Sequence, residues 1–114
     1  MIKRKDEITI KETKNSQGIS AIIHHDLRDF DGMNEKVRMF SHVSILPNEK
    51  VNYHVHQNEF ECYYVLSGKG LYNDNGEEVE ITEGTITYTP SGCGHGLVNT
   101  GDAPLEFIAL IVKD

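Results

Sequence analysis

The chain has 114 residues and a hydrophobic content of 38%, which suits one domain with a single core of modest size. Its net charge of −7 argues against a nucleic-acid partner, because binding phosphates needs a basic face. No apolar run approaches the roughly 18 residues of a membrane helix, and the basic start MIKRKDEITIKE has no apolar segment behind it. We therefore expect neither membrane insertion nor export, and Cys62 and Cys93 fit a reduced, cytoplasmic protein better than a disulfide.

Alternating apolar and polar residues, interrupted by turn residues, run along most of the chain. Near the N-terminus they predict strands over 7–12 and 19–25, followed by a loop over 27–35. The remaining strands are expected over 37–46, 51–56, 60–67, 70–73, 77–82, 85–89, 95–100 and 105–112. Because no amphipathic helical stretch of useful length stands among them, the pattern predicts an all-β fold of one domain, a small antiparallel barrel or sandwich.

Three histidines and a glutamate fall into two short segments, YHVHQNEFE and PSGCGHG. His54 and His56 are two residues apart, so on a strand both point to the same face. Glu61 follows a short linker and can return on the next strand, where it shares a face with Tyr63. His95 arrives much later, from a glycine-rich turn. Imidazole and carboxylate donors that leave positions open are typical of a site for one divalent transition metal, Mn, Fe, Ni, Co or Zn.

The plainer interpretation is that His54 and His56 are ordinary strand histidines on a polar face. We favour it less, because three inward imidazoles and a carboxylate are costly inside a small barrel without a metal to satisfy them.

The same residues resemble the signature of a known family. The first stretch reads His-x-His-x4-Glu-x6-Gly, with His54, His56, Glu61 and Gly68. The second reads Gly-x5-Pro-x-Gly-x2-His-x3-Asn, with Gly84, Pro90, Gly92, His95 and Asn99. Together they resemble the two motifs of the cupin superfamily, of the small single-domain metal-binding type. Asn48 stands where the family usually has Gly, and Asn tolerates the left-handed conformation that such a turn uses.

The resemblance implies a double-stranded β-helix of jelly-roll type, similar to RmlC, over residues 37–114. It also implies that His54, His56, Glu61 and His95 are the metal ligands. Residues 1–36 match no part of the family motifs, and we expect them to form an arm that packs on a second copy in a homodimer.

Four protein ligands on an octahedral ion leave two adjacent positions for water, substrate or dioxygen. Cupins with this ligand set include dioxygenases, isomerases, decarboxylases and lyases, so the resemblance implies a metalloenzyme for a small oxygen-rich substrate without fixing the reaction. The alternative is a non-catalytic sensor or carrier of a small molecule. No catalytic acid or base beyond the ligands is identifiable, and none of the arginines, Arg4, Arg28 and Arg38, lies inside a motif.

Candidate substrate-binding residues are Tyr53, Tyr63 and Tyr88, since a buried tyrosine usually finds a partner for its hydroxyl. His42, on the strand before the metal-binding pair, is a further candidate.

Two other features leave alternatives open. His24 and His25 are neighbours in a predicted strand, so at most one of them reaches a pocket, and a solvent-facing or core position is the simpler account of each. Cys93 lies two residues before His95, where a structural thiol is a simpler interpretation than a reactive one.

Overall fold

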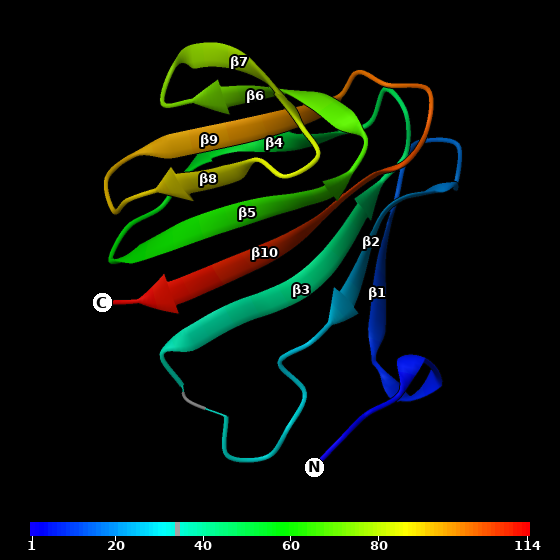
Figure 1. Cartoon of the computed structure of the whole chain (residues 1–114), viewed down its shortest axis with the longest axis vertical. Helices are drawn as coiled ribbons and strands as arrows, with labels where there is room; N and C mark the ends of the chain where they lie inside the picture. The colour runs from blue at the N-terminus through cyan, green and yellow to red at the C-terminus, as the bar shows by residue number, and fades with distance from the viewer. Residues whose placement is uncertain (34) are drawn as a thin grey trace.

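Two antiparallel β-sheets make up the computed structural model, which describes residues 1–33 and 35–114 (Figure 1). One sheet has six strands in the order β1-β2-β3-β10-β5-β8, and the other has four in the order β4-β9-β6-β7. The strands are β1 (Ile10–Lys14), β2 (Ser20–Asp26), β3 (Val37–Ile45), β4 (Lys50–Val55), β5 (Glu59–Ser67), β6 (Lys69–Asp74), β7 (Glu77–Thr82), β8 (Ile86–Thr89), β9 (Gly94–Asn99) and β10 (Leu105–Lys113). This architecture confirms the predicted all-β jelly roll.

The strand boundaries follow the sequence pattern closely from β2 onward, where each predicted end lies within one residue of the observed one. The strand predicted over 7–12 is the exception. A 3-10 helix, η1 (Lys5–Glu7), occupies its start, because the Glu7 N–H donates to the Arg4 carbonyl at 2.9 Å and the Glu7 carboxylate accepts from the Arg4 N–H at 3.1 Å. In the loop predicted over 27–35, residue 34 lies outside the described residues.

The core lies between the sheets and depends on strict alternation in the central strands. In β10, which pairs with both β3 and β5, every second side chain is buried: Leu105, Phe107, Ala109 and Ile111. Tyr72, Ile81 and Leu97 of the four-stranded sheet pack into the same cluster. The sheets are therefore held face to face by apolar side chains.

The N-terminal strands extend the six-stranded sheet. β2 pairs with β3 from Ile22 opposite Ile45 to Asp26 opposite Ser41, and β1 pairs with β2. β1 is the edge strand, and all five of its residues are exposed (Figure 1). The packing of residues 1–36 on a second copy stays a prediction.

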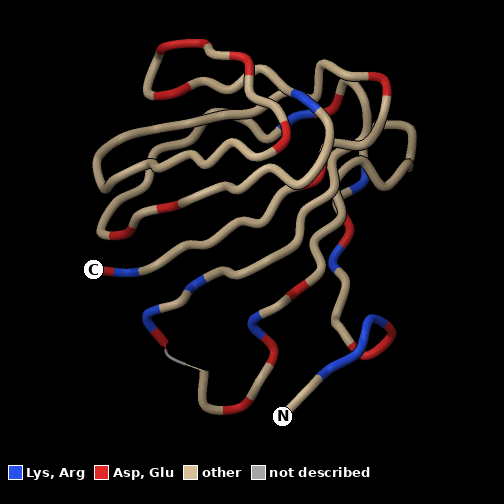
Figure 2. The backbone as a smooth tube through the Cα atoms, in the orientation of Figure 1, with Lys and Arg blue, Asp and Glu red and all other residues tan. Residues whose placement is uncertain are grey.

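Acidic residues are spread along the chain, with a run around the β6–β7 hairpin (Figure 2). Asp74, Glu77, Glu78 and Glu80 of this hairpin are exposed, as expected for a solvated surface. Among the described residues, no helix combines the length and apolar character needed to cross a membrane.

We expect the substitution Gly70→Ala to lower the free energy of unfolding by about 1–3 kcal/mol, because it overpacks the core. A Cβ at this position of β6 would lie 2.6 Å from the Val98 carbonyl oxygen and 2.9 Å from the Leu97 and Leu105 side chains. Urea unfolding of metal-free protein measures the loss. Gly101→Ala is the matched control, since its Cβ would meet nothing closer than 3.4 Å. Equal losses in the two variants would contradict this account of the packing.

Candidate metal centre

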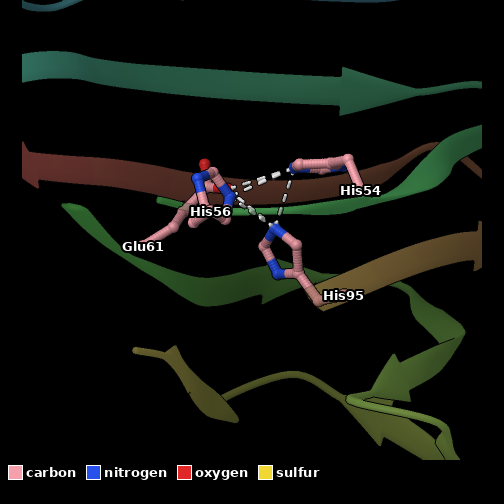
Figure 3. A group of neighbouring side chains, drawn as sticks. All are labelled: His54, His56, Glu61 and His95. Atoms are coloured by element: carbon pink, nitrogen blue, oxygen red, sulfur yellow. Dashed lines mark hydrogen bonds and ion pairs between the residues drawn. The ribbon is translucent and has the colours of Figure 1, made fainter. Parts of the chain in front are cut away.

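Four side chains from neighbouring strands meet between the two sheets (Figure 3). His54 comes from β4, Glu61 from β5, His95 from β9, and His56 follows directly after β4. Each offers one ligand atom, and these atoms all lie within 4.8 Å of one another. Glu61, His56 and His95 are buried, whereas the side chain of His54 is 39% exposed. The group therefore has one open side, next to His54.

The spacing of the donor atoms has the pattern of an octahedron. The Nε2 atoms of His54, His56 and His95 lie 3.1 Å from one another. The Oε1 atom of Glu61 lies 2.8 Å from Nε2 of His56 and of His95, and 3.8 Å from Nε2 of His54. With bonds of about 2.1 Å, octahedral neighbours lie about 3.0 Å apart and opposite ligands about 4.2 Å apart, whereas a tetrahedron spaces all pairs at about 3.4 Å. The three imidazoles thus resemble one octahedral face with Glu61 opposite His54, a set that leaves two neighbouring positions.

Hydrogen bonds on the far side of two rings fix their tautomers. His56 Nδ1 lies 2.6 Å from a Glu59 carboxylate oxygen, and His54 Nδ1 lies 2.7 Å from the Asn52 carbonyl oxygen. Because both partners can only accept, each Nδ1 carries the proton and donates it. In the neutral rings, Nε2 then carries a lone pair that points at the centre of the group.

The third ring is held by hydroxyl groups and by stacking. His95 Nδ1 lies 2.8 Å from the Tyr72 hydroxyl and 3.0 Å from the Thr89 hydroxyl. The Tyr63 ring stacks on the His95 ring with centroids 4.9 Å apart, and it also packs against Phe107. Burial raises the pKa of the Tyr63 phenol, so this side chain remains a neutral packing partner.

The donor set fits a divalent cation. Two imidazole lone pairs and a carboxylate converge at about hydrogen-bond distance in a buried position, and such a group repels itself unless a positive charge lies within it. The imidazole and carboxylate donors suit Mn, Fe, Co, Ni or Zn.

Glu59, whose carboxylate contacts the outer nitrogen of His56, is itself bound by Arg38. Arg38 binds Glu59 through two contacts of 2.7 Å, and its guanidinium lowers the pKa of Glu59 to about 2. The register between β3 and β10 shifts here, because Met39 pairs with Ile111 while Val37 pairs with Val112. Arg38, which lies between them, has no paired residue on β10 in this register. The shift gives Arg38 its place beside the site. No motif marked Arg38 or Glu59 in the sequence, and a register shift of this kind has no clear sequence signal.

A cavity of about 220 Å³ lies beside the four donor residues. Its polar lining includes His54, His56, Glu61, His24 and Arg38. Most of the remaining lining, which we call the apolar wall, consists of Ile22, Met39, Val43, Val51, Phe107, Ala109 and Ile111.

Of the four candidate substrate-binding residues, the structure brings only Tyr63 to this cavity. Tyr88 is 59% exposed, because its neighbours Thr87 and Thr89 take the inward positions of β8. Tyr53 is 48% exposed and lies over Gly94, where an added Cβ would be 2.3 Å from its hydroxyl oxygen. His42 faces away from the core and pairs with Glu106 at 2.9 Å, because Ser41 and Val43 take the inward positions of β3.

The structure also distinguishes the neighbouring histidines. His24 lines the cavity, and burial lowers its pKa. His25 contacts the His42 carbonyl on the other face of the sheet, at 3.1 Å. Cys93 does not line the cavity, but its carbonyl oxygen accepts a hydrogen bond from the His56 N–H at 3.0 Å, which is a structural role.

Comparison with known proteins gives one consistent family. The family model for the cupin domain matches residues 41–111. An oxalate-binding protein of Thermotoga maritima is 37% identical over 113 residues, which cover 98% of this chain and 93% of that protein. A crystal structure described as a predicted oxalate decarboxylase from Thermotoga maritima superimposes with a TM-score of 0.88 at 36% identity over the full length of both chains.

More distant similarities share only part of the chain or only the fold. Glucose-6-phosphate isomerase of Thermococcus litoralis is 40% identical over 70 residues, but these cover 57% of this chain and 37% of that enzyme. The structure of KdgF from Halomonas has a TM-score of 0.79 at 16% identity, covering 97% of this chain and 91% of that one, and shows a shared fold alone.

The pair formed by Arg38 and Glu59 predicts a pH-dependent contribution to stability. A carboxylate whose pKa falls from 4.5 to about 2 on folding stabilises the protein above pH 4.5, and this contribution is lost as the pH falls towards 2. We expect Arg38→Ala to cost about 1 kcal/mol at pH 6, since Arg38 is half exposed, and progressively less below pH 4.5. Urea unfolding of metal-free protein across this range measures the difference, with Arg4→Ala as the control. A loss that stayed constant down to pH 2 would contradict the assignment.

Proposed function

This chain belongs to the cupin domain family, and from that premise we propose that it holds one divalent transition metal through His54, His56, Glu61 and His95. When bound, the ion supplies a Lewis acid or a dioxygen-binding centre for a small oxygen-rich acid in the cavity. The observation that carries this proposal is the convergence of four donor atoms with octahedral spacing beside a cavity.

An ion held by these four residues would keep two neighbouring positions, which would suit two oxygen atoms of one acid. The relative from Thermotoga maritima is named an oxalate-binding protein, which supports a small chelating acid as the ligand class here.

The surrounding residues orient the side chains that would hold the ion. Glu59 and the Asn52 carbonyl hold two imidazoles with Nε2 directed at the proposed ion position, and Tyr72 and Thr89 orient the third ring.

Within the described cavity lining, His24 is the titratable side chain beyond the donors that is able to exchange a proton near pH 7. We therefore assign His24 as the proton donor or acceptor of any reaction in this cavity.

The second candidate function is binding without turnover. It is favoured by the described cavity lining, in which Glu61 is the one carboxylate, so that this lining offers no second carboxylic acid for proton transfer.

Incubation of metal-loaded protein with oxalate and 2-oxo acids, with and without dioxygen, separates the two functions. An acid that raises the melting temperature and is consumed supports an enzyme, whereas an acid that raises it and is recovered unchanged supports a binding protein.

We expect chelator-stripped wild-type protein without a His-tag to bind one Mn²⁺, Co²⁺ or Zn²⁺ per chain in a calorimetric titration. His54→Ala should weaken that affinity by roughly 100-fold or more and leave the melting temperature of the metal-free protein almost unchanged, because the partly exposed His54 contributes little to the core. His42→Ala is the matched control, since His42 is similarly exposed but lies outside the cavity. Wild type that stays metal-free in the presence of Mn, Fe, Co, Ni and Zn would refute the site.

We also infer that two copies form a homodimer. Four apolar side chains on the outer face of β5 and β8 are between 38% and 65% exposed: Tyr64, Leu66, Ile86 and Tyr88. Tyr64 lies opposite Ile86 in the ladder of these two strands, so the four form one patch. Exposed aromatic and aliphatic side chains of this kind are typical of an interface between proteins. The N-terminal arm, with Ile10 51% exposed on the edge strand, is the second candidate contact.

Light scattering should give twice the chain mass of 12.9 kDa. The double substitution Tyr64→Lys with Tyr88→Lys should yield monomers, because it places charge in the centre of the patch, and Ile10→Lys tests the predicted contact of the N-terminal arm separately. Dissociation by Ile10→Lys alone would assign the contact to the arm instead, and a wild-type mass of 12.9 kDa would exclude the dimer.

The two thiols support a reducing compartment. Cys62 on β5 and Cys93 before β9 are both free and half-buried. We therefore propose a cytoplasmic location.

A further inference from the structure

We infer that the acid bound at this site carries an apolar substituent of several carbon atoms, so that its natural ligand is a 2-oxo or 2-hydroxy monoacid rather than oxalate. This inference rests on the metal-dependent acid binding proposed above. It concerns the part of the ligand that lies beyond the two chelating oxygen atoms.

The chemistry of the apolar wall is the first argument. Val43, Phe107, Ala109 and Ile111 are at most 3% exposed, and Met39 extends the wall towards Arg38. Oxalate presents charged oxygen atoms at both ends, and an apolar wall has no donors to satisfy them. A hydrocarbon substituent, in contrast, gains free energy when it leaves water for such a surface.

The extent of the wall is the second argument. Across the six-stranded sheet, Glu61 on β5 pairs with Ile111 on β10, and Ile111 pairs with Met39 on β3. The lining continues to Ile22 on β2, three strands from Glu61. At about 4.8 Å between strands, the wall runs roughly 14 Å across the sheet, well beyond a two-carbon chelate.

The lack of a free cation in the described lining of this cavity is the third argument, and it disfavours a second carboxylate on the ligand. The charge of Arg38 is already matched by both carboxylate oxygens of Glu59 at 2.7 Å. His24 is the other basic group of the lining beyond the metal-binding set, and burial lowers its pKa, which disfavours its charged form. A ligand with one chelating head and an uncharged tail therefore fits better than a diacid.

A series of acids with one chelating head tests the tail alone. We propose calorimetric titration of Mn²⁺-loaded protein with glyoxylate, pyruvate, 2-oxobutanoate, 2-oxopentanoate and oxalate. Each buried methylene is worth about 0.8 kcal/mol, so the affinity should rise about fourfold with each added carbon until the cavity is filled. The longer 2-oxo acids should then bind more tightly than oxalate.

Two variants locate the effect in the wall. Ala109→Val adds volume at the wall and should weaken 2-oxopentanoate at least fourfold while leaving glyoxylate unchanged. Ala103→Val, on an exposed loop, is the matched control. Should Ala109→Val fail to fold, Val51→Thr keeps the side-chain shape at a half-buried position of the wall, and it should flatten the dependence on chain length.

Failure of this inference and failure of the proposed function give different results. Tight oxalate binding with no gain along the 2-oxo series would overturn the apolar tail and leave metal-dependent acid binding intact. An equal loss for glyoxylate and 2-oxopentanoate in Ala109→Val would also overturn it. Metal-loaded protein that bound neither oxalate nor any 2-oxo acid would overturn the proposed function itself.

Discussion

The close convergence of donor atoms is the constraint on which this site depends. Three imidazole nitrogens lie 3.1 Å from one another, and a Glu61 oxygen lies 2.8 Å from two of them, in a largely buried position. The partners of His54 and His56 fix protons on the outer nitrogens, so in the neutral rings the Nε2 lone pairs face inward. A group of lone pairs and a carboxylate this close is unfavourable unless a positive charge lies within it, and the proposed cation would supply that charge.

The two sheets supply the rigidity that this arrangement needs. The ladder between β4 and β9 pairs His54 directly with His95, and β5 brings Glu61 from the opposite sheet. The His95 ring is held by Tyr63, which itself packs on Phe107 in the centre of the core. The donors therefore inherit their positions from the hydrophobic core, and loss of the metal should leave the fold largely intact.

The fold and the donor set were predictable because both follow from the alternation of inward and outward side chains along each strand. Parity placed Glu61 on the inward face with Tyr63, and the two-residue spacing of the first histidine pair placed both rings on one side. Features that depend on broken alternation or on local hydrogen bonds were missed. Arg38 reaches the site through a register shift, and Glu7 turns the chain where a strand was expected. The residue type alone could not tell which tyrosines line the cavity. A tyrosine that faces inward and one that faces outward differ only in their position along the strand.

The central claim is that these four residues bind one ion with octahedral geometry and two free neighbouring positions. Anomalous diffraction from crystals soaked in Mn²⁺ or Co²⁺ tests it most directly. We predict one peak per chain, about 2.1 Å from the three Nε2 atoms and the Glu61 oxygen, with His54 opposite Glu61 and two solvent ligands on the remaining positions. A peak bound by other residues, or a closed tetrahedral ion with no solvent ligand, would contradict the account.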